Sequence, residues 1–250
     1  MLIWRETALV YSKTLAFRRR VEAAKLLIER AVSTGPVVFS MSMGKDSTTM
    51  GGLALEVLGS EARMVHLRSP YALPGGEHVE SYFATRCSLS IVPYRKTLAQ
   101  YIEWLQEVGL PHERESHHAG AARGKASVAR EWAEAQSVTV QALGLRAEES
   151  GVRKAVLRHK GPLYRRADGL WTAWPVGWWK SADVWAYIAS RDLPYHRMYD
   201  CETHGWTRHT IRNAGWLTTN DPGRIPWLRA HFPDQYRALT EAFPRTRQMG

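Results

Sequence analysis

The chain has 250 residues, 44% hydrophobic and 23% charged, which excludes wholesale disorder and allows one large α/β domain with a small addition at most. Its 34 lysines and arginines against 24 acidic residues give a net charge of +10, which favours a polyanionic partner such as nucleic acid or nucleotide phosphates. Two cysteines are too few for a disulfide framework or a four-cysteine iron–sulfur cluster, so we expect no such cluster.

The first residues of the chain carry Arg5 and Glu6 and lack the continuous apolar segment of a signal peptide. No apolar run reaches the length of a membrane span. We therefore expect a cytoplasmic protein with no membrane partner.

Hydrophobic periodicity predicts helices that alternate with strands. Apolar side chains at helical spacing predict an amphipathic helix over 12–31, and the apolar run 36–40 predicts a buried strand, followed by a helix over 46–58. The pattern then predicts strands at 63–67, 89–92, 138–143 and 170–176, and helices at 77–85, 97–108, 126–136 and 181–191. This alternation is typical of a Rossmann-like, mostly parallel sheet with helices on both faces.

Two stretches depart from the pattern. Residues 111–125 are polar and predict a long loop, and from about Leu193 prolines, arginines and aromatic residues replace the regular periodicity. We expect a nucleotide-binding α/β domain over 1–195 and a basic, tryptophan-rich, irregular extension over 196–250.

The loop between the first strand and the helix 46–58 is suited to binding phosphate. The first turn of a helix offers unpaired N–H groups and the positive end of a dipole. Gly44 lets the backbone approach a phosphate, Lys45 adds a cation, and Asp46 caps the helix or holds Mg²⁺. Hydroxyl donors come from Ser40, Ser42 and Ser47. An ordinary strand-to-helix turn is the alternative interpretation, and the P-loop of kinases is excluded because Asp46 stands where that motif has Ser or Thr.

Three segments together resemble a known family. Residues 42–47, Ser-Met-Gly-Lys-Asp-Ser, resemble the Ser-Gly-Gly-Lys-Asp-Ser signature of the PP-loop ATP pyrophosphatases, with Met43 at the second position. Residues 144–150 resemble the Gly-x-Arg-x-x-Glu-Ser element of the phosphoadenylyl-sulfate (PAPS) reductase branch, and 175–195 resemble its Trp-x-x-x-Asp-Val-Trp helix and Leu-Pro-Tyr turn. The resemblance spans roughly residues 12–200.

This resemblance implies an adenine nucleotide α-hydrolase-like fold and an enzyme that binds ATP or an adenylyl sulfonucleotide with Mg²⁺. The enzyme would adenylate an acceptor and release pyrophosphate. The implied catalytic residues are Lys45, Asp46 and Arg146, with Asp46 as the metal ligand. The implied nucleotide-binding residues are Ser40, Ser42, Met43, Gly44, Ser47, His66, Gly144, Glu149 and Arg153.

Some of these assignments have simpler alternatives. Arg146 at a strand end suits bidentate binding of an oxyanion, but it could form a surface ion pair with Glu149 instead. His66 either lines the adenine pocket or packs in the core.

The resemblance fails at the C-terminus. Reductases of this branch carry a nucleophilic cysteine in a C-terminal Glu-Cys-Gly-Leu-His-type segment, and residues 243–250 contain none. Sulfonucleotide reduction therefore remains only as an alternative, with Cys201 or the thiol of a partner as the nucleophile. Cys201, His204 and His209 fit the spacing of a zinc site only loosely.

The C-terminal part suggests a macromolecular partner. Most of the 11 tryptophans lie between Trp171 and Trp227, interleaved with arginines such as Arg208, Arg212 and Arg224. Such a mixture suits a phosphate backbone with stacked bases, so DNA or tRNA is a candidate partner. Core tryptophans are the simpler interpretation, and a non-enzymatic, nucleotide-gated nucleic-acid-binding protein is the third functional alternative.

Overall fold

The computed structural model describes residues 3–111, 128–129, 131–203, 205–219, 221 and 223–249. The chain forms two compact units. The first comprises Met1–His66, Gly76–Ile91 and Ala133–Arg197, and the second comprises Leu67–Gly75, Val92–Trp132 and Met198–Gly250. The predicted division at residue 195 stays a prediction. None of the described helices combines the length and hydrophobicity that crossing a membrane requires.

A six-stranded sheet has the order β3-β2-β1-β4-β6-β5. Its strands are β1 (Val37–Met41), β2 (Arg63–Arg68), β3 (Ser88–Pro93), β4 (Val140–Leu143), β5 (Leu163–Arg165) and β6 (Trp171–Ala173). Pairing is parallel for β1 with β2, β1 with β4 and β4 with β6, and antiparallel only for β5 with β6 among the ladders described. The predicted mostly parallel α/β fold is confirmed. The sequence did not reveal β5, because its three residues lie in no longer apolar stretch, whereas the equally short β6 lies within the apolar stretch 170–176.

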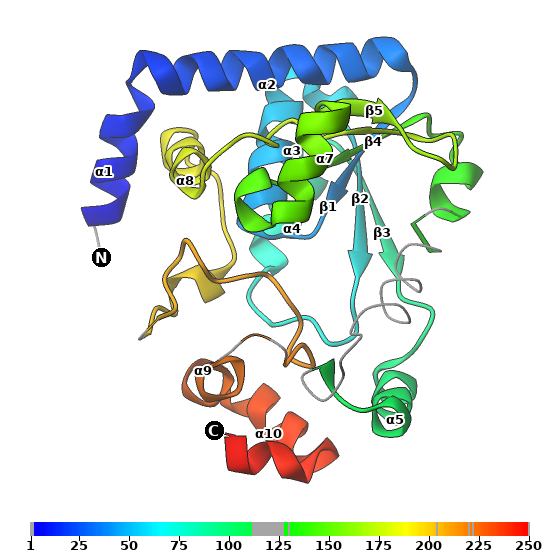
Figure 1. The fold of residues 1–250 in the computed structure, drawn as a ribbon, viewed down its shortest axis with the longest axis vertical. Coiled ribbons are helices and arrows are strands. Elements are labelled where there is room, and N and C mark those ends of the chain that lie inside the picture. The colour runs from blue at the N-terminus through cyan, green and yellow to red at the C-terminus, as the bar shows by residue number, and fades with distance from the viewer. Residues whose placement is uncertain are drawn as a thin grey trace. The chain divides into compact units, whose positions relative to one another are not determined.

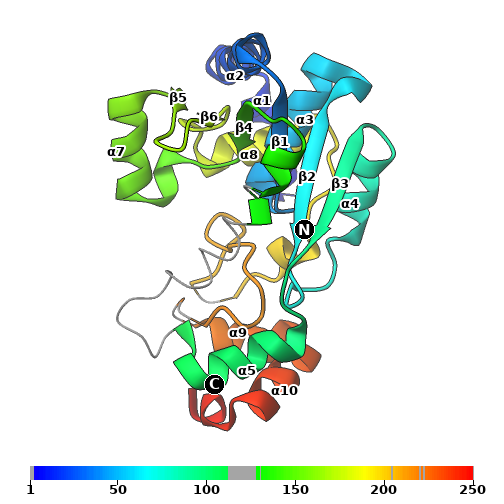
Figure 2. The same cartoon turned by 90° about the vertical axis from the view of Figure 1, so that its right-hand side faces the viewer.

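The register of the central strands positions their carboxyl ends together. Ser40 of β1 pairs with Val65 of β2 on one side and with Leu143 of β4 on the other. Figure 2 shows β1 and β2 side by side. The loops that follow β1 and β4 therefore leave the same edge of the sheet, where open α/β sheets bind ligands.

The helices of the first unit are α1 (Ile3–Ser12), α2 (Leu15–Thr34), α3 (Lys45–Leu58), α4 (Glu77–Ala84), α7 (Gly151–Lys160) and α8 (Ser181–Ser190). The predicted helix at 12–31 corresponds to α2, which begins after Thr14, whose hydroxyl accepts the amide N–H of Phe17. No helix was predicted for α1, which lies beside α8 (Figure 1) and places Trp4 5.2 Å from the ring of Trp185. Contacts with α8 of this kind stabilise α1, although its own sequence pattern is too weak to predict a helix.

Close packing fixes α3 against the sheet. A Cβ at Gly51 would lie 2.8 Å from the side chains of Met41 on β1 and Phe83 on α4. A Cβ at Gly52 would lie 2.7 Å from the side chain of Leu193. A larger residue at either position would force these side chains to shift, so glycine lets α3 pack closely behind the loop that precedes it.

The second unit contains α5 (Leu98–Val108), α9 (Arg224–His231), α10 (Pro233–Ala242) and the 3-10 helix η5 (Pro244–Met249). The expectation of irregular structure throughout this region is wrong for α9 and α10. Their prolines occupy the first turns of the helices: Pro226 is the third residue of α9, and Pro233 is the first of α10. Proline is tolerated there because the first N–H groups of a helix have no partner within the helix. The loop predicted at 111–125 lies almost entirely outside the described residues.

Candidate functional site

The loop between β1 and α3 is closed by its own serines. The amide N–H of Ser42 donates to Ser47 Oγ at 3.1 Å, and that hydroxyl donates to the carbonyl oxygen of Gly44 at 3.0 Å. The two hydroxyl groups, Ser42 Oγ and Ser47 Oγ, are also 3.1 Å apart. Both predicted serines therefore shape the loop around Gly44, which is the N-cap of α3.

Met43 takes the left-handed conformation that the similar signature leaves to glycine. Its φ is +58°, and its side chain is buried. A non-glycine residue in this region costs about 1–2 kcal/mol. Burying a methionine side chain gains about 1.5–3 kcal/mol, which offsets that cost. The loop thus keeps a glycine-type turn although the glycine is absent.

Lys45 and Asp46 form the first turn of α3. The Lys45 side chain is only 3% exposed, and its Nζ lies 3.1 Å from Oδ2 of Asp46. Neither side chain is exposed, because the turn is packed into the molecule. A buried ammonium group costs free energy unless a countercharge accompanies it, and Asp46 supplies one.

Gly144 brings the end of β4 against this turn. A Cβ at Gly144 would lie 2.8 Å from the amide nitrogen of Ser47 and 2.9 Å from the carbonyl carbon of Asp46. Both are backbone atoms that cannot move aside, so no larger residue fits. The second element of the resemblance is thereby joined to the first.

Arg146, two residues further on, is buried, with 2% of its side chain exposed. Its Nε donates to Asp46 Oδ1 at 2.6 Å, and its Nη1 donates to Glu148 Oε2. Its Nη2 lies 3.6 Å from Oε1 of Glu149. The alternative of a surface ion pair is therefore wrong. We call Lys45, Asp46, Arg146, Glu148 and Glu149 the N-terminal cluster.

The pKa of Arg146 reflects these neighbours. Burial alone lowers the pKa of a guanidinium, but the carboxylates of Asp46, Glu149 and Glu148 outweigh it and raise the pKa above its ordinary value. The guanidinium is thus a permanent cation held at the edge of the sheet, next to the start of α3.

Glu148 and Glu149 differ in their anchorage. Oε2 of Glu148 accepts the amide N–H of Ser181, at the start of α8, at 2.7 Å. Glu149 pairs instead with Arg153 on α7. The sequence did not single out Glu148, because it stands at an unspecified position of the Gly-x-Arg-x-x-Glu-Ser element. Only its adjacency to Arg146 could have suggested it.

Two further predicted residues lie on the neighbouring strands. Ser40 Oγ accepts a hydrogen bond from Gln141 Nε2 of β4 at 2.9 Å. Nδ1 of His66 on β2 lies 2.9 Å from the carbonyl oxygen of Met41, and its Nε2 lies 3.9 Å from Glu80 Oε2. These contacts tie His66 to the end of β1 and leave its role toward adenine a prediction.

Metal ligands are sparse in the described part of the chain. No group of three or more His, Cys, Asp or Glu side chains there could hold a metal ion. His204 of the loosely spaced zinc motif lies outside the described residues. Cys201 is partly exposed and not in a disulfide, and its carbonyl oxygen accepts the indole N–H of Trp227 at 2.7 Å.

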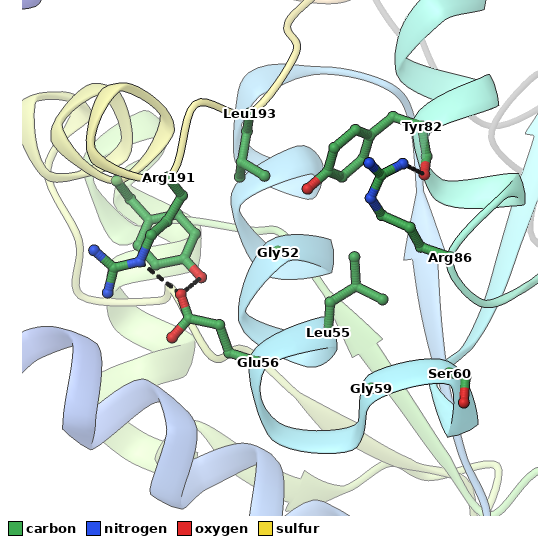
Figure 3. Close-up of a pocket in the computed structure, with 10 residues that line it drawn as sticks. Gly52, Leu55, Glu56, Gly59, Ser60, Tyr82, Arg86, Arg191 and Leu193 are labelled. Atoms are coloured by element: carbon green, nitrogen blue, oxygen red, sulfur yellow. Dashed lines mark hydrogen bonds and ion pairs between the residues drawn. The ribbon is translucent and has the colours of Figure 1, made fainter.

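A cavity of about 400 Å³ lies at the other end of α3 (Figure 3). Its lining includes Glu56, Tyr82, Arg86, Tyr187 and Arg191, and none of the predicted site residues is among the described residues that line it. The cavity and the sequence motif thus indicate opposite ends of one helix. We favour the N-terminal end, because only there do strand ends, a helix N-terminus and buried cations coincide.

The arginines proposed to contact nucleic acid are largely internal. Arg224 is fully buried, and desolvation lowers its pKa to about 10 although Asp221 opposes the shift. Arg208 is buried beside Glu202, at 2.9 Å, whereas Arg212 is exposed. Of the tryptophans in this region, the buried ones are Trp174, Trp179, Trp185, Trp216 and Trp227. Arg208 and Arg224 therefore cannot be surface contacts, and most of these tryptophans belong to the core.

Solved structures of other proteins share the fold. PAPS reductase from Candida auris, in a phosphate complex, is 14% identical with a TM-score of 0.57, and the match covers 79% of this chain and 90% of that one. FMN adenylyltransferase from Candida glabrata, with FMN and the ATP analogue AMPCPP, is 14% identical with a TM-score of 0.53, covering 78% and 68%. The same enzyme with FAD and inorganic pyrophosphate gives 14%, a TM-score of 0.52, and coverage of 78% and 66%.

Sequence comparison is more specific than these likenesses, which at such low identity show the fold alone. No curated protein matches the chain. The family model of the phosphoadenosine phosphosulfate reductase domain matches residues 36–215, which include the loop, Gly144 and the N-terminal cluster. The chain therefore belongs to the phosphoadenosine phosphosulfate reductase domain family.

Proposed function

We propose that this protein is a PP-loop enzyme that binds ATP or an adenylyl sulfonucleotide at the start of α3 and adenylates an acceptor with release of pyrophosphate. The observation that carries the proposal is the junction of α3 with the end of β4. There Gly144 touches the backbone of Ser47, and the guanidinium of Arg146 is 2.6 Å from Asp46. Two cations, Lys45 and Arg146, thus flank one helix N-terminus.

The chemistry follows from that arrangement. An acceptor nucleophile attacks the α-phosphorus of ATP. The bond from the α-phosphorus to the oxygen that bridges the α and β phosphates breaks, and pyrophosphate leaves. Backbone N–H groups at the start of α3 and the ammonium of Lys45 stabilise the negative charge that grows on the leaving group. Arg146 binds a phosphate or sulfate oxygen. Ser42, Ser47 and Gly44 hold the loop in shape, because their mutual hydrogen bonds fix it before the ligand arrives.

The donor set fits Mg²⁺ held mainly by the nucleotide. Magnesium is usually bound through one or two carboxylates together with substrate phosphates, and Asp46 is the carboxylate at the loop. When bound, the ion would neutralise phosphate charge. Lys45, Arg146 and Arg153 are balanced by Asp46, Glu148 and Glu149, so the protein alone offers a polyphosphate little net positive charge.

Two solved structures with this fold support both the binding of ATP and the release of pyrophosphate. The two FMN adenylyltransferase structures contain an ATP analogue in one case and inorganic pyrophosphate in the other. Adenylyl transfer with pyrophosphate release is therefore compatible with this architecture. Candidate acceptors are a sulfur compound, a sulfate ester or a base of DNA or tRNA.

Sulfonucleotide reduction is the second candidate, favoured by the family model and by the PAPS reductase structure. It needs a thiolate, and burial raises the pKa of the Cys87 thiol, which disfavours that ion. Cys201 is then the candidate. We expect Cys201→Ser to retain nucleotide binding and most activity, and a variant that binds but has lost all chemistry would support the reductase.

Product analysis decides between these candidates. The protein is incubated with ATP labelled at the α or the γ phosphate, with Mg²⁺ and candidate acceptors. The proposal expects labelled AMP or adenylylated acceptor together with pyrophosphate. ADP with inorganic phosphate would contradict it, and sulfite released from PAPS in the presence of a thiol would establish the reductase.

A further inference from the structure

The carboxylate of Glu148 joins Arg146 to a helix that is distant in sequence. Its Oε2 accepts hydrogen bonds both from Nη1 of Arg146 and from the amide N–H of Ser181, the latter at 2.7 Å. Ser181 is the first residue of α8, a helix whose residues are almost all buried. Glu148 thus connects the guanidinium to a rigid part of the first unit.

The guanidinium of Arg146 is held from two sides and is less engaged at the third nitrogen. Nε is bonded to Asp46, and Nη1 is bonded to Glu148 and lies 3.5 Å from the carbonyl oxygen of Trp179. Among the described residues, the carboxylate neighbour of Nη2 is Glu149, at 3.6 Å, which is too long for a hydrogen bond. Glu149 is also shared with Arg153.

We infer that Glu148 is a positioning residue, which ties Arg146 to the start of α8 so that Nη2 faces the anionic end of the bound nucleotide. This inference rests on the proposed function. When the nucleotide binds, its oxyanion replaces Glu149 as the neighbour of Arg146 Nη2, whereas the hydrogen bonds from Arg146 to Asp46 and Glu148 persist. A fixed fork of this kind loses less conformational entropy on binding than a mobile arginine does.

Whether Glu148→Gln binds ATP more weakly or more tightly than the native protein distinguishes a positioning role of Glu148 from a purely electrostatic one. Glu148→Gln removes a negative charge near the anion, so a purely electrostatic role predicts tighter binding of ATP. The neutral amide in this variant holds the guanidinium less firmly than a carboxylate does, although its oxygen can still accept the N–H of Ser181. Positioning therefore predicts weaker binding.

The test is a titration of ATP, in buffer with and without Mg²⁺, into the native protein, Glu148→Gln, Arg146→Ala and the double variant. We expect Glu148→Gln to weaken binding by about tenfold in the native background and by less than about twofold when Arg146 is absent. Thermal unfolding of each variant is measured in parallel. Glu56→Gln is the control, since it removes a carboxylate that is hydrogen-bonded to another arginine, Arg191, at the opposite end of α3, and it should bind ATP as tightly as the native protein.

Each outcome has a distinct meaning. Equal or tighter binding by Glu148→Gln, with Arg146→Ala weakened, overturns the positioning role and leaves the proposed function intact. An equal loss on Glu148→Gln in both backgrounds shows that Glu148 acts through the fold instead of through Arg146, and this also overturns it. If the native protein does not bind ATP, the proposed function fails, and the inference fails with it.

Discussion

Charged groups lie at both ends of α3, and they differ in how completely they are hydrogen-bonded. At the C-terminal end, Glu56 accepts Tyr187 Oη and Arg191 Nε at 2.7 Å each, and Lys25 Nζ lies 2.6 Å from its other oxygen. We call Glu56, Lys25, Tyr187 and Arg191 the Glu56 cluster. At the N-terminal end, the backbone is strained at Met43, and among the described residues the carboxylate nearest to Nη2 of Arg146, that of Glu149, is 3.6 Å away.

This difference separates a structural cluster from a binding cluster. The Glu56 cluster has short contacts to both carboxylate oxygens, and it joins α3 to α2 and α8. The N-terminal cluster keeps two buried cations, Lys45 and Arg146, at the first turn of a helix, which is costly for stability alone. Close pairing of charges is therefore a poor guide to function by itself, and backbone strain together with incomplete hydrogen bonding is a better one.

The largest expected effect is on turnover, after removal of the loop cation. Lys45→Ala should lower the rate of AMP formation at least about 100-fold, because the charge on departing pyrophosphate then lacks its ammonium. Asp46→Ala should act in the same direction. The rate is followed with α-labelled ATP, and Lys25→Ala of the Glu56 cluster is the control, which should keep the native rate. A near-native rate in Lys45→Ala removes that residue from the mechanism.

Arg146→Ala should come next. We expect the affinity for the anionic substrate to fall by about 2–4 kcal/mol, as for loss of a buried charged contact. Because Asp46 and Glu148 lose their buried cation, the free energy of unfolding should fall by about 3–5 kcal/mol as well. Titration calorimetry and urea unfolding measure the two effects. Arg191→Ala should lower stability without affecting binding, and if the two arginine variants bind equally well, the two ends of α3 are not distinct.

Gly144→Ala should have an intermediate effect. The new Cβ would lie 2.8 Å from the amide nitrogen of Ser47, so β4 and α3 must separate. Overpacking of this kind costs about 1–3 kcal/mol in stability, and binding should weaken because the two halves of the site move apart. Gly151→Ala is the control, since a Cβ there meets no atom within 4 Å. Native stability and affinity in Gly144→Ala would mean that the close approach is unimportant.

Glu56→Gln should have the smallest effect on the nucleotide and a modest one on stability. Burial raises the pKa of Glu56, but the hydrogen bonds from Lys25, Arg191 and Tyr187 together lower it by more than burial raises it. The net shift of the pKa is therefore downward. A carboxyl whose pKa is lowered by folding stabilises the protein above its unfolded pKa, which is about 4.3, and this stabilisation disappears as the pH falls through the folded pKa. At pH 7 we expect a loss of about 1–2 kcal/mol, allowing for partial exposure.

Urea unfolding of native and Glu56→Gln protein at pH 7 and at several acidic values checks this. The difference in the free energy of unfolding between the two proteins should shrink as the pH falls below the pKa of the unfolded carboxyl. The affinity of Glu56→Gln for ATP at pH 7 should equal the native value. A difference that does not vary with pH would show that the charge of Glu56 is not what stabilises the cluster.

Local patterns predicted the elements that position the site. The apolar strand before Ser42, the polar loop and the helix from Lys45 all occur where periodicity placed them, because each has a strong pattern of its own. The short strand β5 and the helix α1 did not stand out, because tertiary contacts stabilise them more than their own sequences do.

The site itself was only partly predictable. Motif resemblance brought Lys45, Asp46 and Arg146 together as candidates, but the burial of Lys45 and Arg146 depends on packing that no short motif encodes. The role of Glu148 depends on Ser181, which is distant in sequence. The arginine-rich C-terminal pattern misled for the same reason, since composition does not distinguish the buried Arg224 from the exposed Arg212.

Titration of ATP into the native protein, Lys45→Ala and Glu56→Gln tests most directly whether the N-terminal end of α3 is the nucleotide site. We expect the native protein and Glu56→Gln to bind ATP with equal affinity and Lys45→Ala to bind it at least about tenfold more weakly, with its fold intact by circular dichroism. Undiminished binding by Lys45→Ala, or loss of binding confined to Glu56→Gln, would contradict it and transfer the site to the other end of the helix.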